Sequence, residues 1–317
     1  MGGALDPVVA DGRRRLRAAL DDLSPGSRVE VALSGGADSL ALAACLAFVA
    51  AREGWMAGAV VVDHGLQPGS AEVAERAAEQ ARTLGLEAEV VAVEVGTDGG
   101  PEAAARDARY AVLRSRPVDA VLLGHTLDDQ AETVLLGLGR GSGPRSLAGM
   151  PAVDGIVRRP FLGLRRADTE RICTASDLPW WTDPHNADRG FRRNRLRHEV
   201  MPLLEDVLDG GVAEALARTA DQLRADTSLL DELAAEVADP CAVPLLAALP
   251  AALRSRVLRR AALEAGADGS RLAAVHVGEL DRLITDWHGQ DKVELPGRIS
   301  ASRVGDALHF GKSAVAG

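Results

Sequence analysis

Hydrophobic and polar positions in the first half of the chain follow two alternating patterns. Short apolar runs rich in valine cover residues 29–33, 59–62, 90–93 and 120–123. Longer segments with a helical spacing of apolar residues lie between them, at residues 39–52, 71–84 and 102–115. This βαβαβαβ order predicts an α/β fold, a doubly wound parallel sheet with right-handed crossovers and helices on both faces.

The pattern changes after about residue 150, which indicates a second domain. Proline-bearing turns surround residues 165–177, and a region rich in alanine, leucine and arginine from 203 to about 286 predicts several helices. The tail, 292–310, alternates weakly and predicts two or three short strands. A chain of 317 residues is also long for a single core. We therefore expect a domain built on the parallel sheet at residues 1–200 and a smaller, mainly helical domain with a short β tail at 201–317.

Polar residues follow each predicted strand. In open parallel sheets, ligands bind beyond the carboxyl ends of the strands. Those ends carry Ser34-Gly35-Gly36, Asp63-His64, Glu94 and Gly124-His125. Polar residues often end strands for purely structural reasons, but aspartate, histidine and glycine together at one edge favour a ligand site.

The loop SGGADS, residues 34–39, joins the first predicted strand to the first predicted helix. Its two glycines allow the sharp turn that brings successive N–H groups close to an anion. Ser34 and Ser39 add hydroxyl groups, and the N-terminus of the following helix attracts negative charge. The loop therefore predicts a phosphate-binding site, with an ordinary strand-to-helix turn as the alternative. Asp38 would repel a phosphate unless a metal or a ribose contact absorbs its charge.

Positive charge in this chain is almost entirely arginine, because its only lysines are Lys292 and Lys312. A phosphate-loop lysine or a Schiff-base lysine in the first half is thereby excluded. The net charge is 36 − 46 = −10, which by itself disfavours nucleic acid, but the arginines are clustered. The densest cluster, 189–197, includes Phe191 and Asn194 and favours a phosphate-facing surface over a solvated helix face.

Three cysteines, Cys45, Cys173 and Cys241, are far apart and form no CxxC pair. Their spacing argues against a disulfide framework, a zinc ribbon or an iron–sulfur site. The longest apolar run, residues 40–51, is too short to span a membrane. The N-terminal residues contain no apolar secretory segment. We expect a cytoplasmic protein with no membrane partner.

A second polar motif, GHTLDDQAETVLLGLGRGSG, covers residues 124–143. Glu132 lies four residues after Asp128 and three after Asp129, so a helix would place these carboxylates on one face. Helix capping alone explains acidic residues in a first turn. Three acids together with His125, at the edge that carries the phosphate loop, are more than a cap requires. They would hold Mg²⁺ against phosphates or bind a cationic amine.

The loop SGGADS resembles the PP-loop of the ATP-pyrophosphatase superfamily, whose members cleave ATP to AMP and pyrophosphate. The motif at 124–143 is similar to a GHxxDDQAET segment of one family within it, the tRNA(Ile)-lysidine synthetases. Further motifs of that family resemble, in the same order, the segments 62–70, 101–113, 158–173 and 180–204. The resemblance runs from about residue 29 to residue 204. Thr126 stands where many members have histidine, and His185 where serine is usual.

The resemblance implies ATP-dependent ligation of free L-lysine to C2 of the wobble cytidine of tRNA(Ile) with a CAU anticodon. An adenylated tRNA would be the intermediate, ATP and Mg²⁺ would be required, and AMP and pyrophosphate would be released. The partners implied are that tRNA and free lysine, and a homodimer is an open alternative to a monomer.

Roles for individual residues also follow from the resemblance. We expect ATP to contact Ser34, Gly35, Gly36, Ala37, Asp38, Ser39, His64, Arg106, Gly124 and His125. Lysine and tRNA are expected at Asp128, Asp129, Glu132, Arg192, Arg193, Asn194 and Arg197. The candidate metal ligands are Asp38 and Asp128. The candidate catalytic residues are Asp38, Arg109, Asp129 and Glu132.

Two other functions are open at the level of sequence. Another PP-loop enzyme, of the tRNA thiolase or amidating type, would use the same loop, but thiolation normally needs paired cysteines and amidation a glutaminase domain. A non-catalytic ATP-binding module would leave the acidic motif and the arginine cluster unused. Trp180 and Trp181 can stack a base, although the low aromatic content, 3%, favours packing in a core.

Overall fold

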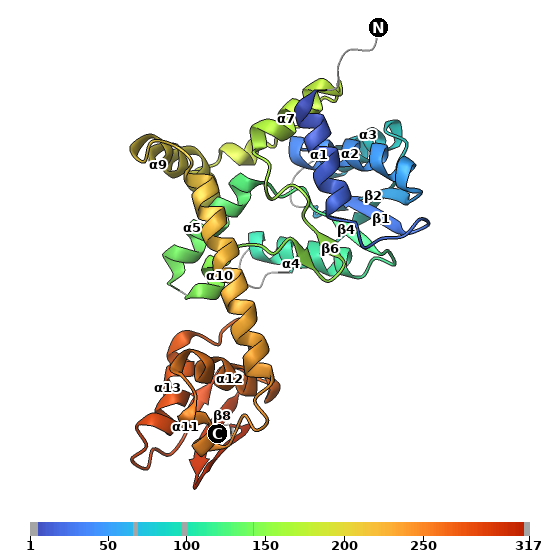
Figure 1. Cartoon of the computed structure of the whole chain (residues 1–317). Helices are drawn as coiled ribbons and strands as arrows, with labels where there is room; N and C mark the ends of the chain where they lie inside the picture. Colours follow the sequence, from blue (N-terminus) through green and yellow to red (C-terminus); the bar gives the residue numbers. More distant parts are fainter. Residues whose placement is uncertain (1–5, 66–68, 97–100, 142, 314–317) are drawn as a thin grey trace. The chain divides into compact units, whose positions relative to one another are not determined.

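The structure is a computed structural model that describes residues 6–65, 69–96, 101–141 and 143–313. The chain divides into two compact units. The first comprises Met1–Thr133 and Met150–Ala217, and the second Val134–Gly149 and Arg218–Gly317. Helices α5 (Leu127–Arg140) and α10 (Val212–Ala235) contribute residues to both units (Figure 1). Among the residues described, no helix combines the length and the apolar character needed to cross a membrane.

The first unit is built on a six-stranded sheet in the order β3-β2-β1-β4-β6-β5. Its strands are β1 (Arg28–Ala32), β2 (Met56–Asp63), β3 (Glu87–Ala92), β4 (Ala120–Leu122), β5 (Val153–Asp154) and β6 (Val157–Arg158). All neighbouring strands are parallel except β5 and β6. The predicted parallel sheet is confirmed. The β5–β6 hairpin goes beyond the prediction, because strands of two residues are too short to show an alternating pattern.

Helices cover both faces of this sheet, as predicted. The helical segments of the first unit are α1 (Pro7–Ala18), α2 (Ala37–Glu53), α3 (Ser70–Thr83), α4 (Pro101–Arg114), α7 (Arg166–Ala175), Pro184–Ala187, α8 (Arg192–Arg195), Leu196–Val200, α9 (Met201–Val207) and the first turns of α5 and α10. Val31 shares a buried cluster with residues of α1, α2, α3 and α7, whereas Val60 and Val121 pack with Tyr110 and Leu113 of α4. Because successive strand residues point to opposite faces, α2 and α3 cover one face and α4 covers the other.

The helices that connect the strands lie on one face of the sheet beyond β1 and on the other face beyond β4. Val31 of β1 pairs with Ala59 of β2 on one side and with Leu122 of β4 on the other. The connections from β1 to β2 and from β2 to β3 run through α2 and α3, whereas the connection to β4 runs through α4. Ligands of doubly wound sheets bind outside the carboxyl ends of the strands at such a reversal. The expected binding crevice therefore lies between the loop after β1 and the residues after β4.

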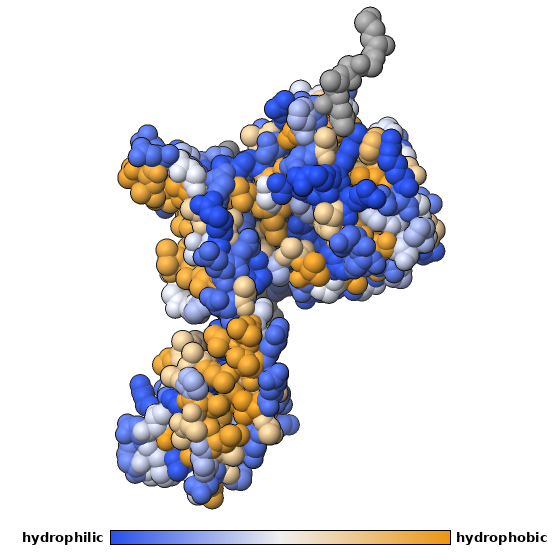
Figure 2. Space-filling view, viewed as in Figure 1, coloured by the Kyte–Doolittle hydropathy of each residue, from blue (hydrophilic) through white to orange (hydrophobic). Residues whose placement is uncertain are grey.

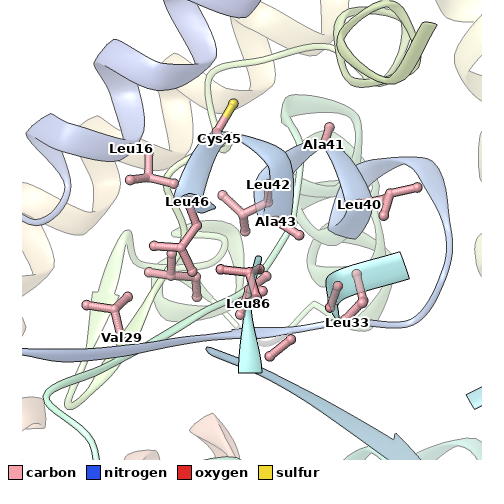
Figure 3. Packing of buried hydrophobic residues seen from close by; sticks show 14 of the residues in the cluster. Leu16, Val29, Leu33, Leu40, Ala41, Leu42, Ala43, Cys45, Leu46 and Leu86 are labelled. Carbon is pink, nitrogen blue, oxygen red and sulfur yellow. The ribbon is translucent and has the colours of Figure 1, made fainter. Parts of the chain in front are cut away.

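The main core of the first unit lies on the face of the sheet covered by α1, α2 and α7 (Figure 3). Leu40, Leu42 and Leu46 of α2 are fully buried, and Leu16 of α1 packs in the same cluster. Helix α1 contains the arginine-rich residues 13–17 and is not among the predicted elements. Its first turn is capped by Asp6, whose carboxylate accepts a hydrogen bond from the backbone N–H of the second helical residue at 3.0 Å.

The second unit combines helices with a small antiparallel sheet. Its complete helices are α6 (Pro144–Leu147), α11 (Val243–Ala248), α12 (Ala251–Glu264) and α13 (Ala274–Thr285). Its strands β7 (Val293–Leu295), β8 (Ile299–Val304) and β9 (Ala307–Lys312) pair in that order. Leu295 and Ala301 of this sheet share one buried cluster with residues of α12 and α13. The predicted helices and the predicted short strands of the tail are confirmed.

Candidate active site

The loop after β1 presents backbone N–H groups at the start of α2. Gly35 has a φ of +79°, which residues with a side chain rarely adopt. The hydroxyl of Ser39 accepts a hydrogen bond from Ser34 N at 3.1 Å and donates one to Gly36 O at 3.0 Å, so it holds the turn closed. Gly36 precedes the helix and offers no side-chain cap. The first N–H groups of α2 are therefore directed at the site that an anion would occupy.

A cavity of about 750 Å³ opens beside this loop. The predicted site residues in its wall are Ser34, Asp38, Ser39, His64, Arg109, Gly124, His125 and Asp129. The fold brings them together because the carboxyl ends of β1, β2 and β4 meet at one edge of the sheet. Three other predicted ATP contacts, Gly35, Gly36 and Ala37, belong to the loop but not to the cavity wall. Arg106 is exposed on α4, where its guanidinium lies 5.1 Å from the centre of the Tyr110 ring.

Gly124 allows the end of β4 to approach the start of α2. A Cβ at this position would lie 2.9 Å from the carbonyl carbon and oxygen of Asp38 and 3.0 Å from Ser39 N. These atoms are backbone and cannot move aside, so a side chain does not fit here. Glycine is therefore required to keep His125 and Asp38 in the same cavity wall.

Asp38 extends from the first turn of α2 into the cavity wall. Burial raises its pKa to about 6, although a hydrogen bond from Thr169 Oγ1 and the charge of Arg166 favour the ionised form. The Nε atom of Arg166 lies 3.5 Å from Asp38 Oδ2. Thr169 and Arg166 belong to α7 and were missed as site residues, because only the tertiary fold packs α7 against α2. Their sole signal in the sequence is the family-like motif at 158–173.

Arg109, on α4, brings a half-buried positive charge to the cavity. Among the described residues no carboxylate pairs with it, and its buried Nε has no hydrogen-bond partner. Burial lowers the pKa of this guanidinium, and the nearby Arg106 and Arg193 lower it further. Withdrawing part of a cation from water without giving it a partner costs free energy. The partner that fits this position is an anionic group of a ligand in the cavity.

His64 and His125 line the same cavity, and each has a buried Nδ1 without a hydrogen-bond partner within the described part of the chain. Burial lowers the pKa of both imidazoles, that of His125 to about 3. Both rings are therefore neutral near pH 7. They can pack against a nucleotide base or form hydrogen bonds without adding charge to the site.

Asp129 is the residue of the acidic motif that reaches the cavity. Its Oδ2 accepts hydrogen bonds from Thr126 N at 2.8 Å and from Thr126 Oγ1 at 2.9 Å, while Arg166 lies 3.1 Å from its Oδ1. Burial opposes ionisation, but the charges of Arg166 and Arg193 hold the pKa of Asp129 below its usual range. Thr126, the departure from the histidine usual in the family, thus acts as a tether for Asp129.

Glu132 and Asp128 lie outside the wall of this cavity. The Glu132 side chain is 1% exposed, and its two oxygens accept hydrogen bonds from Arg193 Nε at 2.7 Å and Arg197 Nε at 2.8 Å. Asp128 accepts hydrogen bonds from Arg165 Nη2 at 2.9 Å and from the backbone N–H of Arg166 at 2.7 Å. Both carboxylates therefore serve as partners of arginines, and neither presents a free oxygen to the cavity. The lysine contact expected at Glu132 and the metal contact expected at Asp128 stay predictions.

The arginine cluster at 189–197 has an inner and an outer side. Arg193 and Arg197 point inward to the buried glutamate of α5, whereas Arg192 is exposed. Two further exposed arginines of the cluster are Arg189 and Arg195. The amide of Asn194 donates hydrogen bonds to two backbone carbonyl oxygens, at 2.7 and 2.9 Å, and so secures the preceding turn. The four residues predicted to face tRNA therefore have different environments, and Arg192 is the one that faces solvent.

Comparison with known proteins identifies two family matches. Residues 10–204 match the PP-loop domain, and residues 242–309 match the TilS substrate binding domain. Among solved structures, the U34-tRNA thiolase NcsA from Methanococcus maripaludis, with its iron–sulfur cluster, has a TM-score of 0.58 at 20% identity. The match covers 68% of this chain and 79% of that chain. At this level of identity the likeness establishes the fold alone.

Several relatives carry the name tRNA(Ile)-lysidine synthase. The enzyme from Streptomyces coelicolor is 56% identical over 297 residues, which cover 88% of this chain and 84% of its own. The one from Thermobifida fusca is 53% identical and covers 92% of this chain and 94% of its own. The one from Mycobacterium tuberculosis is 52% identical and covers 92% and 93%. Because more than half of the aligned residues are identical over most of both chains, this chain belongs to the tRNA(Ile)-lysidine synthase family.

Proposed function

We propose that this protein is an ATP-dependent ligase that joins free L-lysine to C2 of the wobble cytidine of tRNA(Ile) with a CAU anticodon. The product is lysidine, and AMP and pyrophosphate are released by way of an adenylated tRNA. One observation carries the proposal: in a chain this similar to lysidine synthases, the PP-loop cavity faces a half-buried arginine that lacks an anionic partner among the described residues. The thiolase alternative has weaker support, because the likeness to NcsA rests on 20% identity.

ATP would lie in the large cavity with its phosphates at the loop 34–39. The N–H groups at the start of α2 and the guanidinium of Arg109 would stabilise the pyrophosphate as negative charge develops on it. The neutral rings of His64 and His125 would contact the base or the phosphates. A volume of about 750 Å³ is within the range that small-molecule ligands occupy.

The reaction would proceed in two steps. The C2 oxygen of cytidine attacks the α-phosphorus of ATP, and the bond to pyrophosphate breaks. The ε-amine of lysine then bonds to C2, AMP leaves with the former C2 oxygen, and the amine loses a proton. A carboxylate at this edge of the sheet would accept this proton.

Lysine recognition would rest on Asp129, which lines the cavity and is ionised. Glu132 would contribute through Arg193 and Arg197, because its carboxylate fixes both guanidinium groups beside Asp129, 3.6 and 3.4 Å from its Oδ1. These arginines would face the adenylate or the tRNA backbone once substrate binds. Arg192 would contact tRNA phosphate from the exposed side of the same segment.

Mg²⁺ fits the site through Asp38 together with ATP. Within the described residues there is no group of three or more histidine, cysteine, aspartate or glutamate side chains that could hold a metal. Mg²⁺ on nucleotides normally takes one or two protein carboxylates and completes its shell with phosphate oxygens and water. Asp38 lies beside the phosphate-binding loop and meets this requirement, and the bound ion would neutralise phosphate charge.

Residues 1–200 would carry out catalysis, and residues 201–317 would bind the tRNA. The match of residues 242–309 to a substrate binding domain supports the second assignment.

A homodimer is part of the proposal because α9 carries an exposed apolar surface, visible over α9 in Figure 2. Leu203, Val207 and Leu208 are 60%, 65% and 58% exposed there. Size-exclusion chromatography with light scattering of Val207→Asp tests this, and an unchanged mass would rule out α9 as the interface.

The function is tested by transfer of labelled lysine, with ATP and Mg²⁺, to a tRNA(Ile) transcript that carries CAU. A matched transcript with UAU and the variant Asp38→Ala serve as controls. We expect label on the CAU transcript alone and none with the variant. Pyrophosphate release without label on either transcript would retain a PP-loop enzyme but refute lysine as its nucleophile.

A further inference from the structure

A second cavity lies next to the candidate active site within the first unit. Its volume is about 380 Å³, and it lies between α3 and the segment that follows α7. Val73 of α3 and Trp181 line both this cavity and the larger one. Gly35 of the phosphate-binding loop also belongs to its wall. The two cavities are therefore neighbours that share Val73 and Trp181 in their walls.

Two tryptophans form one side of this second cavity. Trp180 is 37% exposed, so the expectation of core packing is wrong for this residue. The segment that carries it is held firmly, because Trp181 N donates a hydrogen bond to Gly35 O at 2.9 Å and the amide of Gln80 donates one to Pro179 O. An exposed indole on a fixed backbone is a prearranged aromatic surface for a ligand.

The charges at the cavity select the kind of ligand that fits. Among the described residues of its wall, the ionisable ones are Arg76 and Glu79, which have opposite signs and are both exposed, so together they bring no net charge to attract a phosphate. The remaining wall is mostly apolar, with Gln80 and Thr83 as polar groups at its edge. A nucleobase has this combination of properties, since it is planar, uncharged and polar only around its rim.

We propose that this cavity holds the base of a nucleotide next to the target cytidine, stacked on Trp180. The inference rests on the proposed function, because a cytidine in the larger cavity would place its neighbour in a single-stranded loop beside Trp181. Bases splayed out of loops are commonly bound by aromatic stacking. Since Trp181 also holds the carbonyl of Gly35, a base in this cavity would brace the loop that binds the phosphates.

Steady-state kinetics of tRNA-dependent pyrophosphate release test the proposal. Trp180→Ala should raise the KM for tRNA about tenfold, the usual scale for losing one stacked base. The affinity for a non-hydrolysable ATP analogue without tRNA should stay unchanged, which also shows that the variant is folded. Trp180→Phe should restore most of the loss. The matched control is Met56→Ala, an apolar residue that is 52% exposed at the amino end of β2 and should behave like the wild type.

A tRNA carrying 2-aminopurine next to the wobble cytidine gives a direct readout. Its fluorescence should be quenched by the wild-type protein and much less by Trp180→Ala. An unchanged KM and unchanged quenching in that variant would overturn the proposal, as would a loss of ATP-analogue affinity equal to the loss of tRNA affinity. A changed oligomeric state with an unchanged KM would assign the cavity to a protein partner instead. If the wild type releases no pyrophosphate with tRNA, the proposed function itself fails.

Discussion

Replacing Asp38 by asparagine is expected to stabilise the ligand-free protein while abolishing its activity. Burial raises the pKa of Asp38 from 3.8 to about 6, so the ionised carboxylate of the native state is strained at neutral pH. At about 1.4 kcal/mol per pKa unit, this difference corresponds to roughly 3 kcal/mol at pH 7. Asparagine is neutral and keeps an oxygen that can accept the hydrogen bond from Thr169.

The increase in the free energy of unfolding of Asp38→Asn should be smaller than roughly 3 kcal/mol and should depend on pH. The Asp38 side chain is 26% exposed, and Arg166 loses one ionic partner, so we expect about 1–2 kcal/mol. The pKa of Asp38 is about 6 in the folded protein and 3.8 in the unfolded chain. Below pH 3.8 the carboxyl is protonated in both states, and its burial costs nothing through charge. As the pH rises from 3.8 to about 6, the folded state must bury a charged carboxylate, and stability is lost over this range. The advantage of Asp38→Asn should therefore be absent near pH 4, grow up to about pH 6 and remain constant above it.

Thermal unfolding without ATP, followed from pH 4 to pH 8, checks this expectation. At about 2–4 °C per kcal/mol for a domain of this size, the unfolding temperature should rise by several degrees at pH 7. The control is Asp21→Asn, an exposed aspartate of the same unit, which should change little at any pH. A lower unfolding temperature for Asp38→Asn at pH 7, or a gain of equal size at pH 4, would refute the burial argument.

Three further changes test other parts of the site. Glu132→Ala should destabilise the protein by about 3 kcal/mol, because it leaves two partly buried arginines without their carboxylate, and thermal unfolding should show Glu132→Gln losing less. Arg109→Ala should weaken ATP binding about 10- to 100-fold in titration calorimetry without lowering the unfolding temperature, whereas lowered stability would mean that Arg109 has a structural partner. Gly124→Ala should cost about 1–3 kcal/mol and impair ATP binding, because its Cβ would meet the backbone of Asp38 at 2.9 Å, and wild-type affinity would contradict this contact.

The sequence predicted those elements and motifs whose pattern of residues repeats or is complete within a short segment. The valine-rich runs became β1 to β4, and the helical segments between them became α2, α3 and α4 with ends close to those expected. The phosphate-binding loop was recognisable because its two glycines and two serines lie within six consecutive residues, 34–39. The acidic motif was recognisable because its residues share a helix face. In each case the information lies within a few residues, where backbone preference and side-chain spacing act directly.

The partners of those residues were decided only by the tertiary structure. Glu132 pairs with Arg193 and Arg197, which lie 61 and 65 residues away, and Asp38 accepts a hydrogen bond from Thr169, 131 residues away. Sequence spacing carries no information about such pairs, because they depend on α7 and the segment after it returning to the carboxyl edge of the sheet. The sequence by itself therefore determined which groups the site contains. The packing of the fold determined which arginine each acid meets and which of the acids line the cavity.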